Sequence, residues 1–239
     1  MEPFWQRIIQ WLHGIGIHLD TRVSAPVDAT MTPADAAMDL PSLIALAAAL
    51  GWASGFRLYA IVFLVGAVGQ AGWIALPPGL MVLQHPAMLI ASGVMLSVEF
   101  FADKIPGVDS LWDLLHSVIR IPAGAALAAA ALGADGATTA TIAALLGGTL
   151  AASSQAAKTT TRAAINTSPE PFSNLLASLV EDGLVVAALW LAVAHPFVFG
   201  VALLVAVLLM TVVTITLFKF LRAAWRRLST FLSGSQKAA

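Results

Sequence analysis

Charged residues gather in one short segment of this apolar chain. The segment VEFFADKIPGVDSLWD, residues 98–113, holds Glu99, Asp103, Lys104, Asp109 and Asp113, although only 10% of the residues in the whole chain are charged. Carboxylates at this density suit two kinds of chemistry, the binding of a hard cation through oxygen ligands and the relay of protons. Residues 98–113 are therefore the first candidate for a functional site.

The spacing of these residues predicts two helices with polar faces. Residues that follow at i, i+4, i+7 and i+11 lie on one side of an α-helix. The two candidate faces are Ser92, Glu99 and Asp103 on one helix, and Asp109, Asp113, His116 and Arg120 on the next. A polar stripe would thus run from the loop that contains Pro106 into the apolar part of the chain.

A second segment repeats this layout with the opposite signs of charge. Its first helix carries bases where the first segment carries acids, and its second helix carries acids where the first segment carries Arg120. The bases are Lys158 and Arg162, in line with Ser154, and the acids are Glu181 and Asp182, beside Asn174 and Ser178. Asn166 and Glu170 fall in the proline-containing connection. We interpret residues 87–133 and 142–194 as a degenerate two-fold repeat.

The composition is that of an integral membrane protein. Of 239 residues, 59% are hydrophobic, and the mean hydropathy is +0.88. A soluble domain holds about 45–50% apolar residues. Alternating strand patterns are absent, so the fold class that we expect is an all-α membrane protein of about six spans, with two broken or re-entrant elements at the proline loops.

Six apolar windows have the length that a span requires. They lie near residues 41–69, 82–101, 118–134, 137–157, 175–194 and 197–218. If both termini are cytoplasmic, the basic residues fall almost entirely on the cytoplasmic side, as the positive-inside rule requires. The windows and the basic residues together predict a transmembrane domain over 40–218 with both termini cytoplasmic.

The two ends of the chain lie outside this domain. Residues 1–19 alternate aromatic and polar side chains at helical spacing, which predicts a helix lying in the membrane interface. Residues 20–39 are polar and interrupted by prolines, so we interpret them as a linker. Residues 219–239 form a basic cytoplasmic tail.

Arg57 is the exception to the distribution of charge. It falls near the middle of the first span, after the small-residue stretch GWASG at residues 51–55. A charge at that depth normally faces a partner or a wet cavity. We expect the span to be broken there.

The candidate residues divide by charge. Acidic, amide and imidazole groups would bind or relay a cation: Glu99, Asp103, Asp109, Asp113, His116, Asn166, Glu170, Asn174, Glu181 and Asp182. Basic groups would balance charge or hold an anion: Arg57, Lys104, Arg120, Lys158 and Arg162. For His116, a structural role is favoured over metal ligation. No organic cofactor is expected, and whether a metal cation binds stays open.

Several function classes are disfavoured. The absence of cysteine excludes disulfides and thiolate sites. Motifs of hydrolases, zinc proteases and nucleotide-binding loops are missing, so we do not expect an enzyme. A net charge of −1 argues against a nucleic-acid partner. Membrane lipids and a small ion are the expected partners, and a homo-oligomer stays open.

Three functions stay open. Transport of a small ion, with a cation or proton coupling favoured over an anion, follows from the acidic excess. The basic residues could instead hold an anionic lipid or phosphate headgroup, in a lipid-translocating protein or an intramembrane enzyme. In the third alternative, a structural scaffold, the charges only neutralise one another.

The chain resembles a bacterial membrane family catalogued as domain of unknown function 4126. The resemblance rests on EFFADKIPGVDSLWD, SGFRLY, IRIPAGA, and KTTTRAAINTSPEPFSN with SLVEDG, and covers roughly residues 41–195. The resemblance implies a multi-pass inner-membrane protein, but it does not indicate any activity. A fainter similarity is to cation exchangers with an acidic cluster in each of two repeats. Here Glu99, Asp103 and Lys104 match that cluster with stretched spacing, and the second repeat has no acidic copy.

Overall fold

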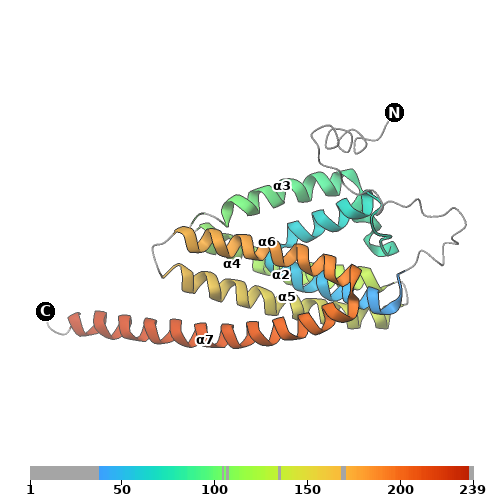
Figure 1. Ribbon diagram of the computed structural model, residues 1–239. Helices are drawn as coiled ribbons and strands as arrows, with labels where there is room; N and C mark the ends of the chain where they lie inside the picture. The colour runs from blue at the N-terminus through green and yellow to red at the C-terminus, as the bar shows by residue number, and fades with distance from the viewer. Residues whose placement is uncertain (1–37, 104, 106–107, 134–135, 168–170, 237–239) are drawn as a thin grey trace, which may run out of the picture.

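The computed structural model describes residues 38–103, 105, 108–133, 136–167 and 171–236, with the side chains of 109, 110, 171 and 228–236 excepted. All regular structure in these residues is helical. The elements are α2 (Leu40–Gln70), η2 (Pro78–Gln84), α3 (Pro86–Ala102), α4 (Val108–Leu132), α5 (Ala137–Ile165), α6 (Pro171–Ala194) and α7 (Pro196–Gln236). Figure 1 shows them side by side, with α7 extending beyond the others at its C-terminal end. The all-α class is confirmed.

Proline starts several of these helices, because its missing N–H costs nothing in the first turn. Pro86, Pro171 and Pro196 are the first residues of α3, α6 and α7. In α2 the Asp39 carboxylate accepts a hydrogen bond from Ser42 N at 3.2 Å and caps the helix. These local signals separate the helices, so the chain can reverse direction between them.

Helix α2 doubles back inside the bundle. Arg57 has φ −145° and ψ 80°, which breaks the helix as the sequence predicts. Before the break, Gly51 faces Gly147 and Gly55 faces Ser154, so this half runs parallel to α5. After the break, Phe63 faces Gly93 and Gly66 faces Leu89, so the second half runs antiparallel to α3. Since α3 and α5 begin at the same end, both ends of α2 lie there (Figure 1). Arg57, at the break, is fully buried.

Small residues bring α2, α4 and α5 into close contact. A Cβ atom built on Gly51 would lie 2.5 Å from the Cα of Gly147, and one on Gly147 would overlap Ala128 and the Gly124 carbonyl. Such close backbone approach is typical of helix packing in membranes. The first half of α2 is accordingly buried almost throughout. It forms the centre of the fold.

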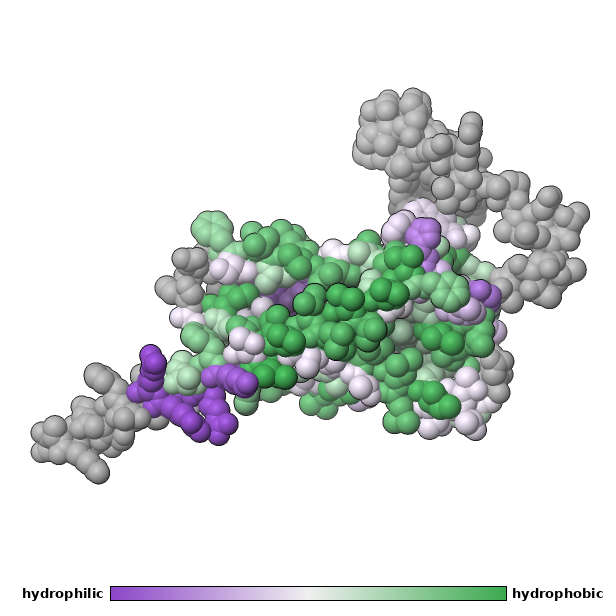
Figure 2. Space-filling view, turned by 60° about the horizontal axis from the view of Figure 1, so that its bottom comes forward, coloured by the Kyte–Doolittle hydropathy of each residue, from purple (hydrophilic) through white to green (hydrophobic). Residues whose placement is uncertain are grey.

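Several helices are long and apolar enough to cross a membrane. They are Leu40–Gln70, Leu111–Leu132, Phe172–Ala194 and Pro196–Arg227, and a fifth candidate is η2 with α3 as one span bent by 69°. A broad hydrophobic surface covers the body, and hydrophilic residues gather near the C-terminal end of α7 (Figure 2). The chain is a membrane protein with four or five candidate spans in its described part.

The boundaries differ from the predicted windows in physically informative ways. Helix α4 begins at Val108, so its polar first turns precede the apolar window. The window 137–157 forms α5, which extends to Ile165 and is too polar to count among the candidate spans. Helix α7 continues to Gln236, through most of the predicted basic tail. The predicted interfacial helix and nearly all of the linker, residues 20–37, lie outside the described residues.

Candidate functional site

The polar faces of five helices converge on one buried charge network. We use this name for the acids and bases that ion pairs connect: Glu99, Asp103, Asp113, Glu181, Asp182, Arg57, Arg120, Lys158 and Arg162. Eight of the nine residues are buried, and Asp182 is partly exposed. The helical spacing in the sequence predicts these polar faces. The polar residues that share them are buried as well: Ser92, Ser154, Asn174 and Ser178.

Asp103 is the centre of this network. As the C-cap of α3 it is held at the helix end, and its Oδ2 lies 3.0 Å from Lys158 Nζ and 3.2 Å from an Arg57 nitrogen. Arg162 approaches the same oxygen at 3.9 Å and donates to the Asp103 carbonyl at 3.1 Å. One carboxylate oxygen thus joins α3 to α2 and α5. Acids of the first repeat-like unit pair here with bases of the second.

Arg120 forms a second branch within the first unit. Its guanidinium pairs with Glu99 at 2.5 Å and with Asp113 at 2.8 Å. Gln155 of α5 accepts from Arg120 at 2.9 Å and donates to the Asp113 carbonyl at 3.3 Å. Arg120 therefore does not pair with Glu181 or Asp182, its counterparts in the repeat. Gln155 is a site residue that sequence reasoning missed; its signal is an amide in an apolar helix, beside Ser154.

The break in α2 delivers both a charge and a backbone carbonyl to the network. Arg57 donates to the Ser178 hydroxyl at 2.6 Å, and its Nε lies 3.0 Å from Asp182. The carbonyl of the preceding Phe56 accepts from Lys158 Nζ at 3.0 Å. Carbonyls released at a helix break need new donors at membrane depth, and Lys158 supplies one.

Lys158 and Arg162, the two bases of α5, both contact α6. Lys158 Nζ lies 3.1 Å from Asp113 and 3.3 Å from Glu181, and Arg162 lies 3.1 Å from Glu181. Arg162 also donates to the Asn174 carbonyl at 3.1 Å. The Asn174 amide donates to Asn166 at 2.9 Å, which ties the end of α5 to the start of α6.

His116 lies in an aromatic group. Its ring stacks on Trp112 with centroids 4.0 Å apart and meets Tyr59 edge-on at 5.8 Å. Its Nδ1 lies 2.9 Å from the Trp112 carbonyl. The described geometry gives His116 ring contacts and a backbone contact but no ion pair, which favours the structural role.

The charges of the network do not cancel. Five carboxylates face four basic groups, so one negative charge is in excess among the described residues. Three carboxylates each keep one buried oxygen that has no hydrogen-bond partner in the described part of the chain: Oε2 of Glu99, Oδ1 of Asp103 and Oδ2 of Asp113. Buried acceptors without partners are uncommon in folded proteins.

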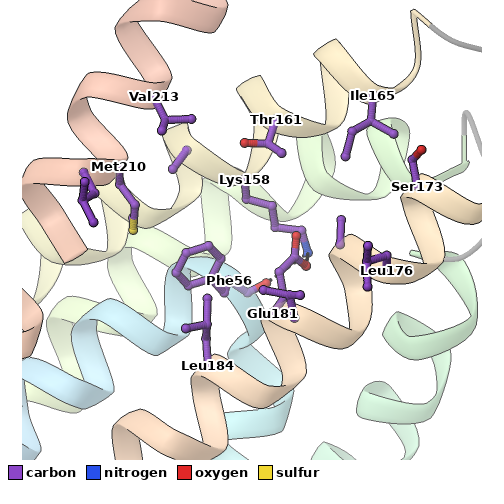
Figure 3. Close-up of a pocket in the computed structure, with 14 residues that line it drawn as sticks. Phe56, Lys158, Thr161, Ile165, Ser173, Leu176, Glu181, Leu184, Met210 and Val213 are labelled. Atoms are coloured by element: carbon purple, nitrogen blue, oxygen red, sulfur yellow. Dashed lines mark hydrogen bonds and ion pairs between the residues drawn. The ribbon is translucent and has the colours of Figure 1, made fainter.

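Three pockets reach the network from different sides. The α5–α6–α7 pocket, about 510 Å³, ends at Lys158 and Glu181, whose side chains meet beside Phe56 in Figure 3. The α4–α5 pocket, about 540 Å³, reaches Asp113 and Arg162. The α2–α3–α6 pocket, about 500 Å³, reaches Asp182. The ion pairs are thus buried but bordered by open space.

Three of the site residues predicted from the sequence cannot be placed in the network. Lys104, Glu170 and the side chain of Asp109 lie outside the described residues. Within the described part, no three His, Asp or Glu side chains are grouped as a metal site requires. Every described carboxylate of the network has a basic partner.

A family comparison covers most of the bundle. The model of the domain of unknown function DUF4126 matches residues 44–216, from the first turns of α2 to the middle of α7. The chain belongs to this family. The match includes every residue of the charge network and confirms the resemblance drawn from the sequence. Neither a curated protein nor a solved structure matches the chain.

Proposed function

We propose that this DUF4126 protein transports a small cation, or a proton coupled to one, across the bacterial inner membrane through the charge network. Burying a charge at membrane depth costs about 2.5–3.5 kcal/mol on insertion scales. Apolar packing often stabilises a core as well as buried ion pairs do, so stability alone gives little reason to keep nine charges. A mobile ion gives such a reason.

The observation that carries the proposal is the acidic excess with its three unpartnered oxygens. A cation or a proton arriving at Glu99, Asp103 or Asp113 would neutralise the excess charge and occupy an acceptor. The four bases would then balance the remaining carboxylates and lock the closed state. Movement of one repeat-like unit against the other would break and remake the Asp103 pairs with Lys158 and Arg162.

Two features support the pathway. Pockets on opposite sides of α5 approach the same network, one at Lys158 and one at Asp113. The broken α2 also places its Phe56 carbonyl beside the charges, and discontinuous helices of this kind line the ion sites of many transporters.

The membrane orientation follows from the basic residues. Lys219, Arg222, Arg226 and Arg227 follow the apolar part of α7, and the α3–α4 and α5–α6 connections lie at that same end of the bundle. The positive-inside rule favours that end as the cytoplasmic one. In the proposed arrangement, helix α2 enters and leaves on the outer side as a re-entrant element, and five helices cross. This proposal differs from the six crossings and the cytoplasmic N-terminus that the sequence alone predicts.

The anionic-lipid alternative is less favoured by the contacts. Lys158 Nζ already has three carboxylates and a carbonyl within 3.3 Å, and Arg162 has Glu181 and two carbonyls. A headgroup phosphate would have to displace these acids from a site that is already net negative.

Flux through proteoliposomes tests the proposal. Purified protein is reconstituted in liposomes, and gradients of protons, sodium, potassium, calcium and manganese are imposed in turn. An enclosed pH-sensitive dye reports proton movement, and a radiolabelled or dye-detected form of each metal cation reports its own uptake. We expect one gradient to drive flux, and Asp113→Asn to abolish it while the protein stays folded, since Arg120 and Lys158 keep other acidic partners. Asp39→Asn, at an exposed helix cap, is the matched control. Unchanged flux in Asp113→Asn would show that the pathway does not run through Asp113, and no flux with any cation would support the scaffold instead.

A further inference from the structure

The α2–α3–α6 pocket combines aromatic walls with one carboxylate. Its volume of about 500 Å³ falls in the range typical of small-molecule sites. Phe63 comes from α2, Phe100 and Phe101 come from α3, and Asp182 comes from α6. Apart from Asp182 and Ser97, every lining residue is apolar. A ligand for this pocket must therefore be mostly hydrocarbon, with one polar group.

Asp182 differs from the other acids of the network. Its side chain is 29% exposed, whereas those of the other four are at most 8% exposed. Among the described residues its one ion-pair partner is Arg57, and the 3.0 Å approach of Arg57 Nε does not form a hydrogen bond. Asp182 is thus the most exposed carboxylate of the network, and it lines an open pocket.

The phenylalanine rings suit a positive group. Phe63 packs against Gly93, where the missing side chain leaves room for the ring between α2 and α3. Phe100 and Phe101 stand nearly perpendicular, with centroids 5.6 Å apart. Ring faces attract a cation within about 6 Å, and the attraction grows when water is excluded. Carboxylate and rings together select for a cation over a neutral group.

We infer that this pocket binds a lipid-soluble amine in its ammonium form. The ammonium pairs with Asp182, and the hydrocarbon body lies against Phe63, Phe101 and Val186. This site goes beyond the proposed transport function, because binding at Asp182 requires neither ion flux nor movement of the repeat-like units. An acyl chain of the bilayer is the competing occupant, and it has no use for the carboxylate.

Binding of a matched pair of probes tests the inference. 2-Phenylethylamine and 2-phenylethanol have the same ring and length but differ in charge at neutral pH. Each is titrated as a radiolabelled ligand against the full chain in lipid nanodiscs, with no ion gradient. We expect saturable binding of the amine, and binding of the alcohol weaker by roughly tenfold or more. Equal binding of the two probes would overturn the inference and assign the pocket to hydrocarbon alone.

Variants locate the site. Asp182→Asn removes the excess charge and leaves Arg57 paired with Asp103, so we expect a folded protein that has lost amine binding. Asp182→Glu should retain binding, and Asp39→Asn should bind as the unaltered chain does. Val186→Phe fills the pocket from an exposed position without changing charge, and it should also abolish binding. Amine binding that survives both Asp182→Asn and Val186→Phe would place the ligand elsewhere.

Discussion

The Asp103 carboxylate and the Lys158 ammonium, 3.0 Å apart and fully buried, join the end of α3 to α5. These residues are 55 positions apart and belong to different repeat-like units. Lys158 also reaches Asp113 and Glu181, so one ammonium holds together acids from three helices. That single positive charge therefore links α3, α4 and α6 to α5.

Lys158→Met should destabilise the protein severely. It leaves three buried carboxylates with one base fewer, and removing one partner of a buried pair costs about 3–5 kcal/mol. Unfolding monitored in detergent by heat or denaturant measures the loss. Lys219→Met, on an exposed turn of α7, should have little effect. Adding Asp113→Asn to Lys158→Met should restore part of the stability; additive losses in this double-mutant cycle would contradict the pairing.

Gly147→Ala should destabilise the bundle by about 1–3 kcal/mol, because the new methyl group overlaps Ala128 and the Gly124 carbonyl. The matched change Gly183→Ala meets no atom within 4 Å and should be neutral or stabilising by up to about 1 kcal/mol. The two unfolding midpoints provide the measurement. Equal midpoints would mean that α4 and α5 are less closely packed than described.

His116→Phe should preserve both folding and cation flux. The replacement keeps a ring against Trp112 and Tyr59, whereas His116→Ala removes it and should cost about 0.5–1.5 kcal/mol beyond the lost burial. Flux in proteoliposomes and unfolding midpoints are measured for both variants. If His116→Phe folds normally but loses flux, the imidazole belongs to the transport pathway and its structural role is insufficient.

Cysteine labelling can test the re-entrant course of α2, because the chain has no native cysteine. Leu40→Cys and Trp73→Cys are at exposed positions, one at each end of α2. Both should react with a membrane-impermeant reagent from the same side of the membrane. Arg222→Cys should react only from the opposite side. Labelling of positions 40 and 73 from opposite sides would show that α2 crosses the membrane.

Helical periodicity accounts for much of what could be predicted from the sequence. Glu99, Asp113, Lys158 and Asn174 are buried because each lies on a polar stripe that one face of its helix can bury. The break at Arg57 was also predictable, since an arginine within an apolar span needs partners. These are local properties, and a single sequence carries them.

Other features depend on contacts between distant segments. Nothing near Arg57 indicates that α2 reverses; its direction is set by Gly51 against Gly147 on one side and Phe63 against Gly93 on the other. The pairing of Arg120 within its own unit likewise depends on how α3 approaches α4. Hydropathy also leaves α5 out of the candidate spans, and Gln155, Lys158 and Arg162 are among the polar residues that lower its hydropathy.

The doubled-back α2 has a consequence for biosynthesis. Helix α2 places Arg57 where its first acidic partner, Asp103, is made only at the end of α3, and its hydrogen-bond partner Ser178 is made 121 residues later. A ribosome would have translated α3 before that arginine could be neutralised, so α2 would remain at the translocon or the bilayer surface until then. The contacts of Arg57 with Ser178 and Asp182 would form only after α6 is made, although α2 is synthesised early.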